Sequence, residues 1–215
     1  MTQDSHDAYG TIARFYDRLL EPMNAPLRAI GLKMHPTDST MTVLDVGCGT
    51  GAHLEAYIAT GATCHGIDMS QAMLEQAHDR LGDNAELLHG DATHLPYDDN
   101  RFDLVFTSMI LHEMESTVRS DIIAEMARVV KPDGRILVID YIEGHRSGKG
   151  KLRRIVSTIA ERIAGTDHYR NWRKYLAEGA IPEMLSDTSL EIEREKVVSG
   201  GNLALWLLRS QSRST

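Results

Sequence analysis

Three glycines follow a short apolar segment in the run Val43-Leu44-Asp45-Val46-Gly47-Cys48-Gly49-Thr50-Gly51. Glycine has no Cβ and accepts positive φ, so such a turn after a buried strand lets the backbone approach a ligand closely. The Gly-x-Gly-x-Gly spacing differs from the dinucleotide fingerprint and from the phosphate loop. Asp45 would repel a pyrophosphate but suits a ligand that carries positive charge, such as an amino group or a sulfonium. The loop therefore favours S-adenosylmethionine over NAD.

Two further acidic residues follow predicted strands. Asp68 comes after the apolar run 62–67, 23 residues beyond Asp45. An acidic residue about 20 positions after such a loop accepts hydrogen bonds from ribose hydroxyls. Asp91 follows the next predicted strand, over 86–89. The alternative for Asp68 is a helix N-terminal carboxylate beside Ser70, stabilised by the helix dipole without any ligand.

The glycine segment resembles the first motif of the class I S-adenosylmethionine-dependent methyltransferases, and the resemblance extends from about Ala8 to Arg209. It implies that the loop residues, the residues after the second and third strands and the end of the fourth strand bind the cofactor. The residues are Asp45, Gly47, Cys48, Gly49, Gly51, Asp68, Met69, Asp91, Ala92 and Ser108. In this family Asp91 and Ala92 would meet the adenine amino group and ring, and Met69 would pack on the adenine face.

The N-terminal segment Ile12-Ala13-Arg14-Phe15-Tyr16-Asp17 resembles the helix that precedes the sheet in ubiquinone and menaquinone C-methyltransferases. The resemblance implies that Tyr16 closes over the cofactor. The alternative is an amphipathic helix whose aromatic residues only pack on the sheet.

Methyl transfer from a sulfonium mainly requires alignment of the acceptor and exclusion of water. A base is needed only where the acceptor must lose a proton. His112 follows the predicted strand over 102–108 and is the candidate base, since its ordinary pKa lies near neutrality. Tyr141, after the predicted fifth strand, is a second catalytic candidate. Packing alone is the alternative for both.

The acceptor is less constrained. His168, Tyr169 and Arg170 are candidates to line its pocket. No Asn-Pro-Pro-Tyr or Asp-Pro-Pro-Tyr follows the fourth strand, and this tetrapeptide marks family members that methylate amide or base nitrogens. Leu152 to Ala164 has the spacing of an amphipathic helix after a basic entry. This helix could admit an amphipathic substrate, rest on anionic lipid as a peripheral membrane contact, or dock on the core.

Apolar runs and helical patterns alternate along the chain, which predicts an α/β fold with a mainly parallel sheet covered on both faces. We expect a Rossmann-like, doubly wound, seven-stranded sheet that ends in an antiparallel hairpin over 190–199 and 203–208, with a helix over 172–185 before it. We expect a single domain made of an N-terminal helical cap (1–40), a cofactor-binding core (41–142), lid and acceptor helices (143–187) and the C-terminal hairpin (188–209).

The 215 residues carry a net charge of -8, which argues against a broad nucleic-acid surface. The start of the chain has no signal-peptide pattern, and no run of 18 apolar residues occurs, so we expect a soluble, cytoplasmic protein. The histidines and the two cysteines show no close ligand pairs, so no metal site is predicted. The sequence does not predict the oligomeric state.

These observations predict a methyltransferase that acts on a small or lipid-like acceptor, with a quinone-related molecule as one option. A phospholipid or another small molecule methylated on nitrogen or oxygen is the alternative acceptor. A cofactor-binding protein without turnover, and an NAD-dependent oxidoreductase, are the alternatives from other classes.

Overall fold

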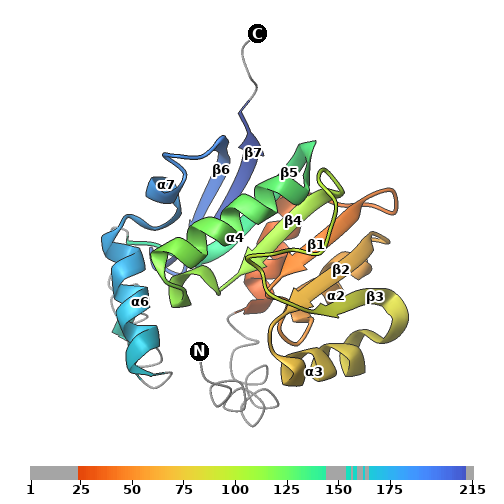
Figure 1. The fold of residues 1–215 in the computed structure, drawn as a ribbon, viewed down its shortest axis with the longest axis horizontal. Coiled ribbons are helices and arrows are strands. Elements are labelled where there is room, and N and C mark those ends of the chain that lie inside the picture. The colour runs from red at the N-terminus through yellow and green to blue at the C-terminus, as the bar shows by residue number, and fades with distance from the viewer. Residues whose placement is uncertain (1–23, 144–153, 156, 159–161, 163–164, 212–215) are drawn as a thin grey trace.

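The computed structural model describes residues 24–143, 154–155, 157–158, 162 and 165–211. A seven-stranded sheet in the order β3-β2-β1-β4-β5-β7-β6 forms its centre (Figure 1). The strands are β1 (Thr42–Val46), β2 (Thr63–Asp68), β3 (Ala85–His89), β4 (Phe102–Ser108), β5 (Val130–Tyr141), β6 (Leu190–Val198) and β7 (Leu203–Ser210). The helices are α2 (Ala52–Ile58), α3 (Gln71–Leu81), α4 (Ser116–Val129), α6 (Thr166–Ala177) and α7 (Ala180–Met184), with short 3-10 turns η2 (Gly82–Asn84) and η3 (Leu111–Glu113).

The first five strands are parallel, and β7 runs antiparallel between β5 and β6. Their buried residues are mostly Val, Leu, Ile and Phe, as expected for strands covered on both faces. The helix over residues 24–34 packs on the same face as α2, since a Cβ at Gly31 would lie 3.0 Å from Leu137 and 3.5 Å from the Tyr57 hydroxyl. Figure 1 shows α4 across the other face. The predicted doubly wound fold with its antiparallel hairpin is confirmed.

Ser70 caps α3 as its residue type suggests, with its hydroxyl accepting the Met73 N–H at 3.3 Å. The helix expected over 172–185 is wrong in its bounds. Helix α6 already begins at Thr166. It ends at Ala177, because Gly179 and Ala180 both adopt positive φ, 86° and 57°. β5 likewise begins at Val130, five residues before the expected start.

Candidate active site

The glycine loop lies at the carboxyl end of β1, beside the end of β2. Gly47, Gly49 and Gly51 have φ values of 75°, 52° and 75°, which other residues rarely adopt. The Gly47 and Cys48 N–H groups donate to the Ile67 carbonyl at 2.8 and 3.0 Å, and this pins the loop to β2. A Cβ at Gly49 would meet no atom within 4 Å. The loop is thus fixed by its neighbours and open on the Gly49 side.

Two carboxylates lie at this loop. Asp68 accepts the Gly49 N–H on one oxygen and the Ser70 N–H on the other, both at 2.8 Å. Burial nevertheless raises its pKa above the ordinary range. Asp45 is 2% exposed, and burial and then the neighbouring Asp68 raise its pKa well above its ordinary value. A cation placed here would stabilise both charges, which agrees with the predicted positively charged ligand.

The ends of β2 and β3 hold the residues expected around adenine. The Gly90 N–H donates to the Asp68 carbonyl at 3.0 Å and joins the two strand ends. The Met69 side chain is 46% exposed and so is free to contact a ligand. Asp91 is exposed and accepts the Thr93 N–H and hydroxyl on one oxygen, while Ala92 is half-buried. An exposed apolar side chain beside acidic hydrogen-bond acceptors fits an adenosine.

Cys48 is part of the same loop, with its thiol buried. Burial, followed by the charges of Asp45 and Asp68, raises its pKa well above the ordinary value. The side chain therefore contributes packing to the loop rather than a thiolate. Ser108 lies half-buried at the end of β4, the neighbour of β1 in the sheet. All predicted cofactor residues within the described part of the chain thus come from the loop or from strand ends at one edge. Tyr16 lies outside the described residues.

A buried histidine–carboxylate pair lies at the ends of β4 and β5. The His112 Nδ1 is 2.7 Å from Asp140 Oδ1, and the two side chains are 2% and 1% exposed. Asp140 also accepts the backbone N–H of His112 at 3.2 Å and that of Tyr141 at 2.7 Å. A carboxylate at Nδ1 selects the tautomer that carries its proton there, so Nε2 is left as the basic nitrogen. His112 thus has the geometry of an oriented base.

No sequence pattern singled out Asp140. Its partner is 28 residues away along the chain, and a single aspartate inside an apolar strand gives no local signal. Only the order of the strands in the sheet could have indicated that Asp140 lies beside His112. β4 and β5 are parallel neighbours, and residues after one strand meet residues at the end of the next.

The other catalytic candidate packs directly on this pair. The Tyr141 ring meets the His112 ring edge-on, with centroids 4.8 Å apart, and the centroid of the Trp172 ring of α6 lies 5.7 Å from that of Tyr141. The Asn171 side chain donates to the Glu113 carbonyl at 2.8 Å and so ties α6 to η3. Helix α6 is therefore a wall of the site that contains His112.

The three acceptor candidates on α6 differ in position. His168 Nδ1 lies 3.7 Å from Glu113 Oε1, and Glu113 lies 3.8 Å from His112 Nε2. The Tyr169 ring packs on Trp172 at 5.8 Å. Arg170 lies instead on the exposed side of α6, where its guanidinium is 3.0 Å from Asp167. The structure brings His168 and Tyr169 to the His112 side and leaves Arg170 outside this cluster.

The central part of the chain matches a family of known proteins. Residues 44–138 match the family described as "Methyltransferase domain". Over these residues, which run from β1 to β5, the chain is similar to a methyltransferase domain. It is 39% identical over 101 residues to a demethylmenaquinone methyltransferase of Clavibacter sepedonicus, a match that covers 46% of this chain and 40% of that protein. It is 28% identical over 221 residues to the ubiquinone/menaquinone biosynthesis C-methyltransferase UbiE of Burkholderia mallei, covering 92% and 88% of the two chains.

Solved structures share the fold of this chain. A putative methyltransferase crystallised with the Trm112 activator of Haloferax volcanii matches over 100% of both chains, with a TM-score of 0.73 and 18% identity. A SAM-dependent methyltransferase of Aquifex aeolicus matches with a TM-score of 0.60 and 22% identity, over 84% of this chain and 88% of that chain. The predicted resemblance to methyltransferases is confirmed, and a phosphoethanolamine N-methyltransferase of Haemonchus contortus, solved in complex with S-adenosyl-L-methionine, shares the fold with a TM-score of 0.64 and 18% identity, over 86% of this chain and 52% of that chain. The chain spans about two fifths of the length of the Clavibacter relative.

Proposed function

We propose that this methyltransferase domain transfers a methyl group from S-adenosylmethionine to a small, lipid-like acceptor of the quinone type. The observation that carries the proposal is the buried pair of His112 and Asp140, next to the glycine loop with its two carboxylates. The Clavibacter and Burkholderia relatives, whose names refer to menaquinone and ubiquinone, support the acceptor class.

The cofactor side uses the loop and the strand ends. When bound, S-adenosylmethionine supplies an electrophilic methyl group on a sulfonium. Asp45 provides a buried negative charge for the amino group, and Asp68 retains lone pairs on both oxygens for the ribose hydroxyls. Met69 covers the adenine face, with Asp91 and Ala92 at the ring edge. The remaining residues of the set shape the site: Tyr16, Gly47, Cys48, Gly49, Gly51 and Ser108.

The acceptor side uses the histidine. A hydroxyl on an aromatic ring becomes a better nucleophile, on oxygen or on a neighbouring ring carbon, when its proton is removed. Nε2 of His112 takes up that proton, and the Asp140 carboxylate stabilises the imidazolium that forms. Tyr141 holds the imidazole edge-on, and Trp172, His168 and Tyr169 give the pocket an aromatic wall on α6.

Calorimetric titration with S-adenosylmethionine, S-adenosylhomocysteine and NAD tests the cofactor half. We expect the first two to bind, NAD not to bind, and Asp68→Ala to weaken binding about tenfold or more, the cost of a lost charged hydrogen bond. Preference for NAD would refute the proposal.

Transfer of labelled methyl to a demethylated quinol, to phosphatidylethanolamine and to small phenols tests the acceptor half. Labelling of the quinol or phenols supports the proposal. Labelling of the phospholipid alone would refute the quinone-type acceptor and indicate a phospholipid acceptor instead. Cofactor binding without methyl transfer to any of these acceptors would indicate a cofactor-binding protein without turnover.

Contact with a membrane and location in the cytoplasm stay predictions. Among the described residues, no helix is long and apolar enough to cross a bilayer.

A further inference from the structure

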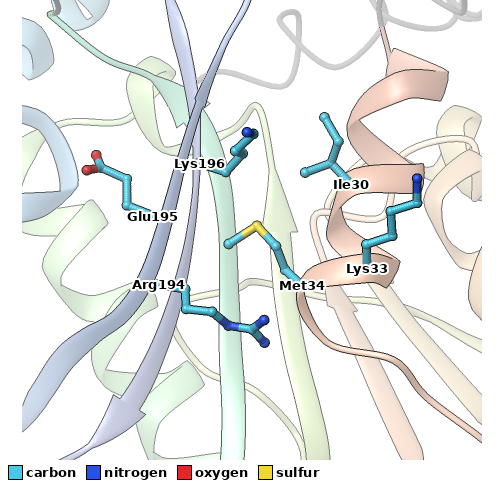
Figure 2. A pocket seen from close by; sticks show the side chains of 6 residues that line it. All are labelled: Ile30, Lys33, Met34, Arg194, Glu195 and Lys196. Atoms are coloured by element: carbon cyan, nitrogen blue, oxygen red, sulfur yellow. The ribbon is translucent and has the colours of Figure 1, made fainter.

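A hollow of about 510 Å³ lies between the helix over 24–34 and the edge strand β6. Figure 2 shows Arg194 and Lys196 on either side of Met34, and Lys33 on the helix that carries Met34. Ile30 and Glu195 complete the lining. The hollow lies on the last strand of the sheet, four strand spacings from β1, or about 19 Å. It is therefore separate from the glycine loop.

The register of β6 explains why cations line this hollow. Arg194 pairs with Leu207 and Lys196 with Leu205. Leu207 in turn pairs with Leu137, the residue that meets the helix over 24–34 at Gly31. Since side chains alternate along a strand, Arg194 and Lys196 face that helix.

Glu195 belongs to the opposite face. It pairs with Trp206 and accepts the indole N–H at 2.9 Å. Figure 2 shows its carboxylate pointing away from Ile30 and Met34. The one acidic side chain in the lining is thus engaged elsewhere and does not neutralise the cations.

The local charge is positive in a protein whose net charge is -8. Within the described part of the chain, Lys33, Arg194 and Lys196 form no ion pair with an acid, whereas the neighbouring Arg135 is paired with Glu193. Burial, followed by the charges of Arg135 and Arg194, lowers the pKa of His35 at the end of the helix, while the charges of Glu193 and Asp103 act in the opposite direction.

The floor of the hollow is apolar. Met34 is 8% exposed and Ile30 is half-buried. The volume lies within the range of about 300 to 1,000 Å³ that is usual for small-molecule sites, which combine apolar walls with a few polar groups. Three cations around an apolar floor match a small molecule that has an anionic group and a short apolar part.

We propose that this hollow is a second ligand site, which binds a small organic anion such as a phosphate monoester or a carboxylate. Arg194 and Lys196 bind the anionic group from β6, and Lys33 binds it from the helix. The apolar part of the ligand packs on Met34 and Ile30. The site does not depend on the proposed methyl transfer, and its test needs no turnover.

Phenyl phosphate is a suitable probe because it carries both an anionic group and an apolar ring. The protein is labelled with ¹³C at its methionine methyls and saturated with S-adenosylhomocysteine, and Met34→Leu assigns the Met34 signal. We expect phenyl phosphate to shift this signal. Arg194→Ala and Lys196→Ala should each weaken binding about tenfold, since a charged hydrogen bond contributes about 1.5 kcal/mol or more.

Arg209→Ala is the matched control, because Arg209 is an exposed cation on β7 that is paired with Glu191 at 2.6 Å. It removes the same charge and should leave the affinity unchanged within a factor of two. If Arg209→Ala weakened phenyl phosphate binding as much as the other two variants, net charge alone would explain the effect, and the proposed site would be wrong.

Three further results would overturn the proposal. One is no Met34 shift up to about 10 mM probe, a limit near 3 kcal/mol of binding free energy. Another is a shift that S-adenosylhomocysteine abolishes, since the anion would then occupy the cofactor site. The third is sedimentation with phosphatidylglycerol vesicles that needs Arg194 and Lys196 while phenyl phosphate does not bind, because the anion would then belong to a membrane surface.

Discussion

The buried carboxyl of Asp45 destabilises the folded protein when it is ionised, but the same charge favours binding of a cationic group. Its folded-state pKa is raised, so the folded protein holds a proton that the unfolded chain has released between the two pKa values. Stability attributable to this carboxyl therefore falls as the pH rises from about 4 toward the folded-state pKa. The cost is greatest where the group is charged, which is also the form that binds a cation.

We therefore expect Asp45→Asn to stabilise the cofactor-free protein at neutral pH, by about 1 kcal/mol or roughly 3 °C in Tm. The gain should disappear below about pH 4, where the aspartate is protonated in both states. Thermal unfolding at several pH values measures this. The same variant should bind S-adenosylhomocysteine more weakly. A lower Tm at neutral pH would show that the ionised carboxylate stabilises the loop instead.

His112 and Asp140 are expected to act as one unit. His112→Ala should lower kcat about 100-fold or more, the usual contribution of a general base. Asp140→Asn should lower kcat in the same direction through the wrong tautomer. Neither should change the Kd of S-adenosylhomocysteine more than twofold, because neither lies in the cofactor residues. His78→Ala, on the exposed side of α3, is the control. Full activity of Asp140→Asn would reduce Asp140 to a packing role.

Among single residues, the sequence predicted those candidate site residues that lie close together along the chain or directly at the end of a strand. The glycine loop and Asp45 lie within nine residues of one another, and Asp68 and Asp91 each follow a strand that has a clear apolar pattern. Asp140 was missed because its meaning comes from a neighbour across the sheet. Arg170 was included because it adjoins His168 and Tyr169 in sequence, but successive residues of a helix point in different directions.

At the scale of the elements, strand β2 packs closely against the glycine loop because it has a glycine, Gly66, at its centre. A Cβ at Gly66 would lie 2.8 Å from Leu87, 2.9 Å from the Cys48 sulfur and 2.9 Å from Leu54. These atoms belong to β3, the loop and α2. The strand can therefore approach all three only because position 66 has no side chain.

Gly66→Ala should overpack this junction and destabilise the protein by about 1–3 kcal/mol. It should also weaken binding of S-adenosylhomocysteine, because the displaced Cys48 lies in the loop. Gly82→Ala is a comparison from the end of α3, where a Cβ would have open space but the φ of 54° is strained. It should lower stability without changing the affinity. Denaturant unfolding and calorimetry of both variants separate the two effects.

The helix over 172–185 was predicted wrongly because Gly179 was passed over inside an otherwise helical pattern. Glycine costs about 1 kcal/mol in a helix and accepts left-handed φ, so it marks a break. The start of α6 at Thr166 had no side-chain cap to signal it. The strands were predicted with smaller errors, and those at the centre of the sheet have apolar runs that are buried on both faces.

At the scale of the whole molecule, the order of the last two strands decides which of them is exposed to water. The run Leu203 to Leu208 is fully apolar and fills the inner place between β5 and β6, while the charged β6 takes the edge. This arrangement follows from sequence, because charged residues suit edge strands and discourage further pairing. The hollow beside β6 could not be predicted, since it depends on how far the helix over 24–34 covers the sheet.

A chain ended after Val198 keeps β6 but lacks β7, so it should not fold. It loses six buried side chains, including Trp206, with a combined burial free energy of about 10 kcal/mol or more, comparable to the whole stability of a domain. We expect an aggregated product without a cooperative unfolding transition. A chain ended after Gln211, which retains the Gln211 N–H bond to the Ser189 carbonyl, should unfold cooperatively. Size-exclusion chromatography and thermal unfolding compare the two.

The inner position of β7 also bears on synthesis at the ribosome. β5 ends at Tyr141 and its neighbour β7 begins at Leu203, 62 residues later. At about 5 to 20 residues per second, the open edge of β5 waits roughly 3 to 12 seconds for its partner to be translated. The nascent chain therefore passes through a stage in which β5 has been translated but its apolar edge has no partner strand. During that interval the fold itself cannot yet protect this edge from aggregation.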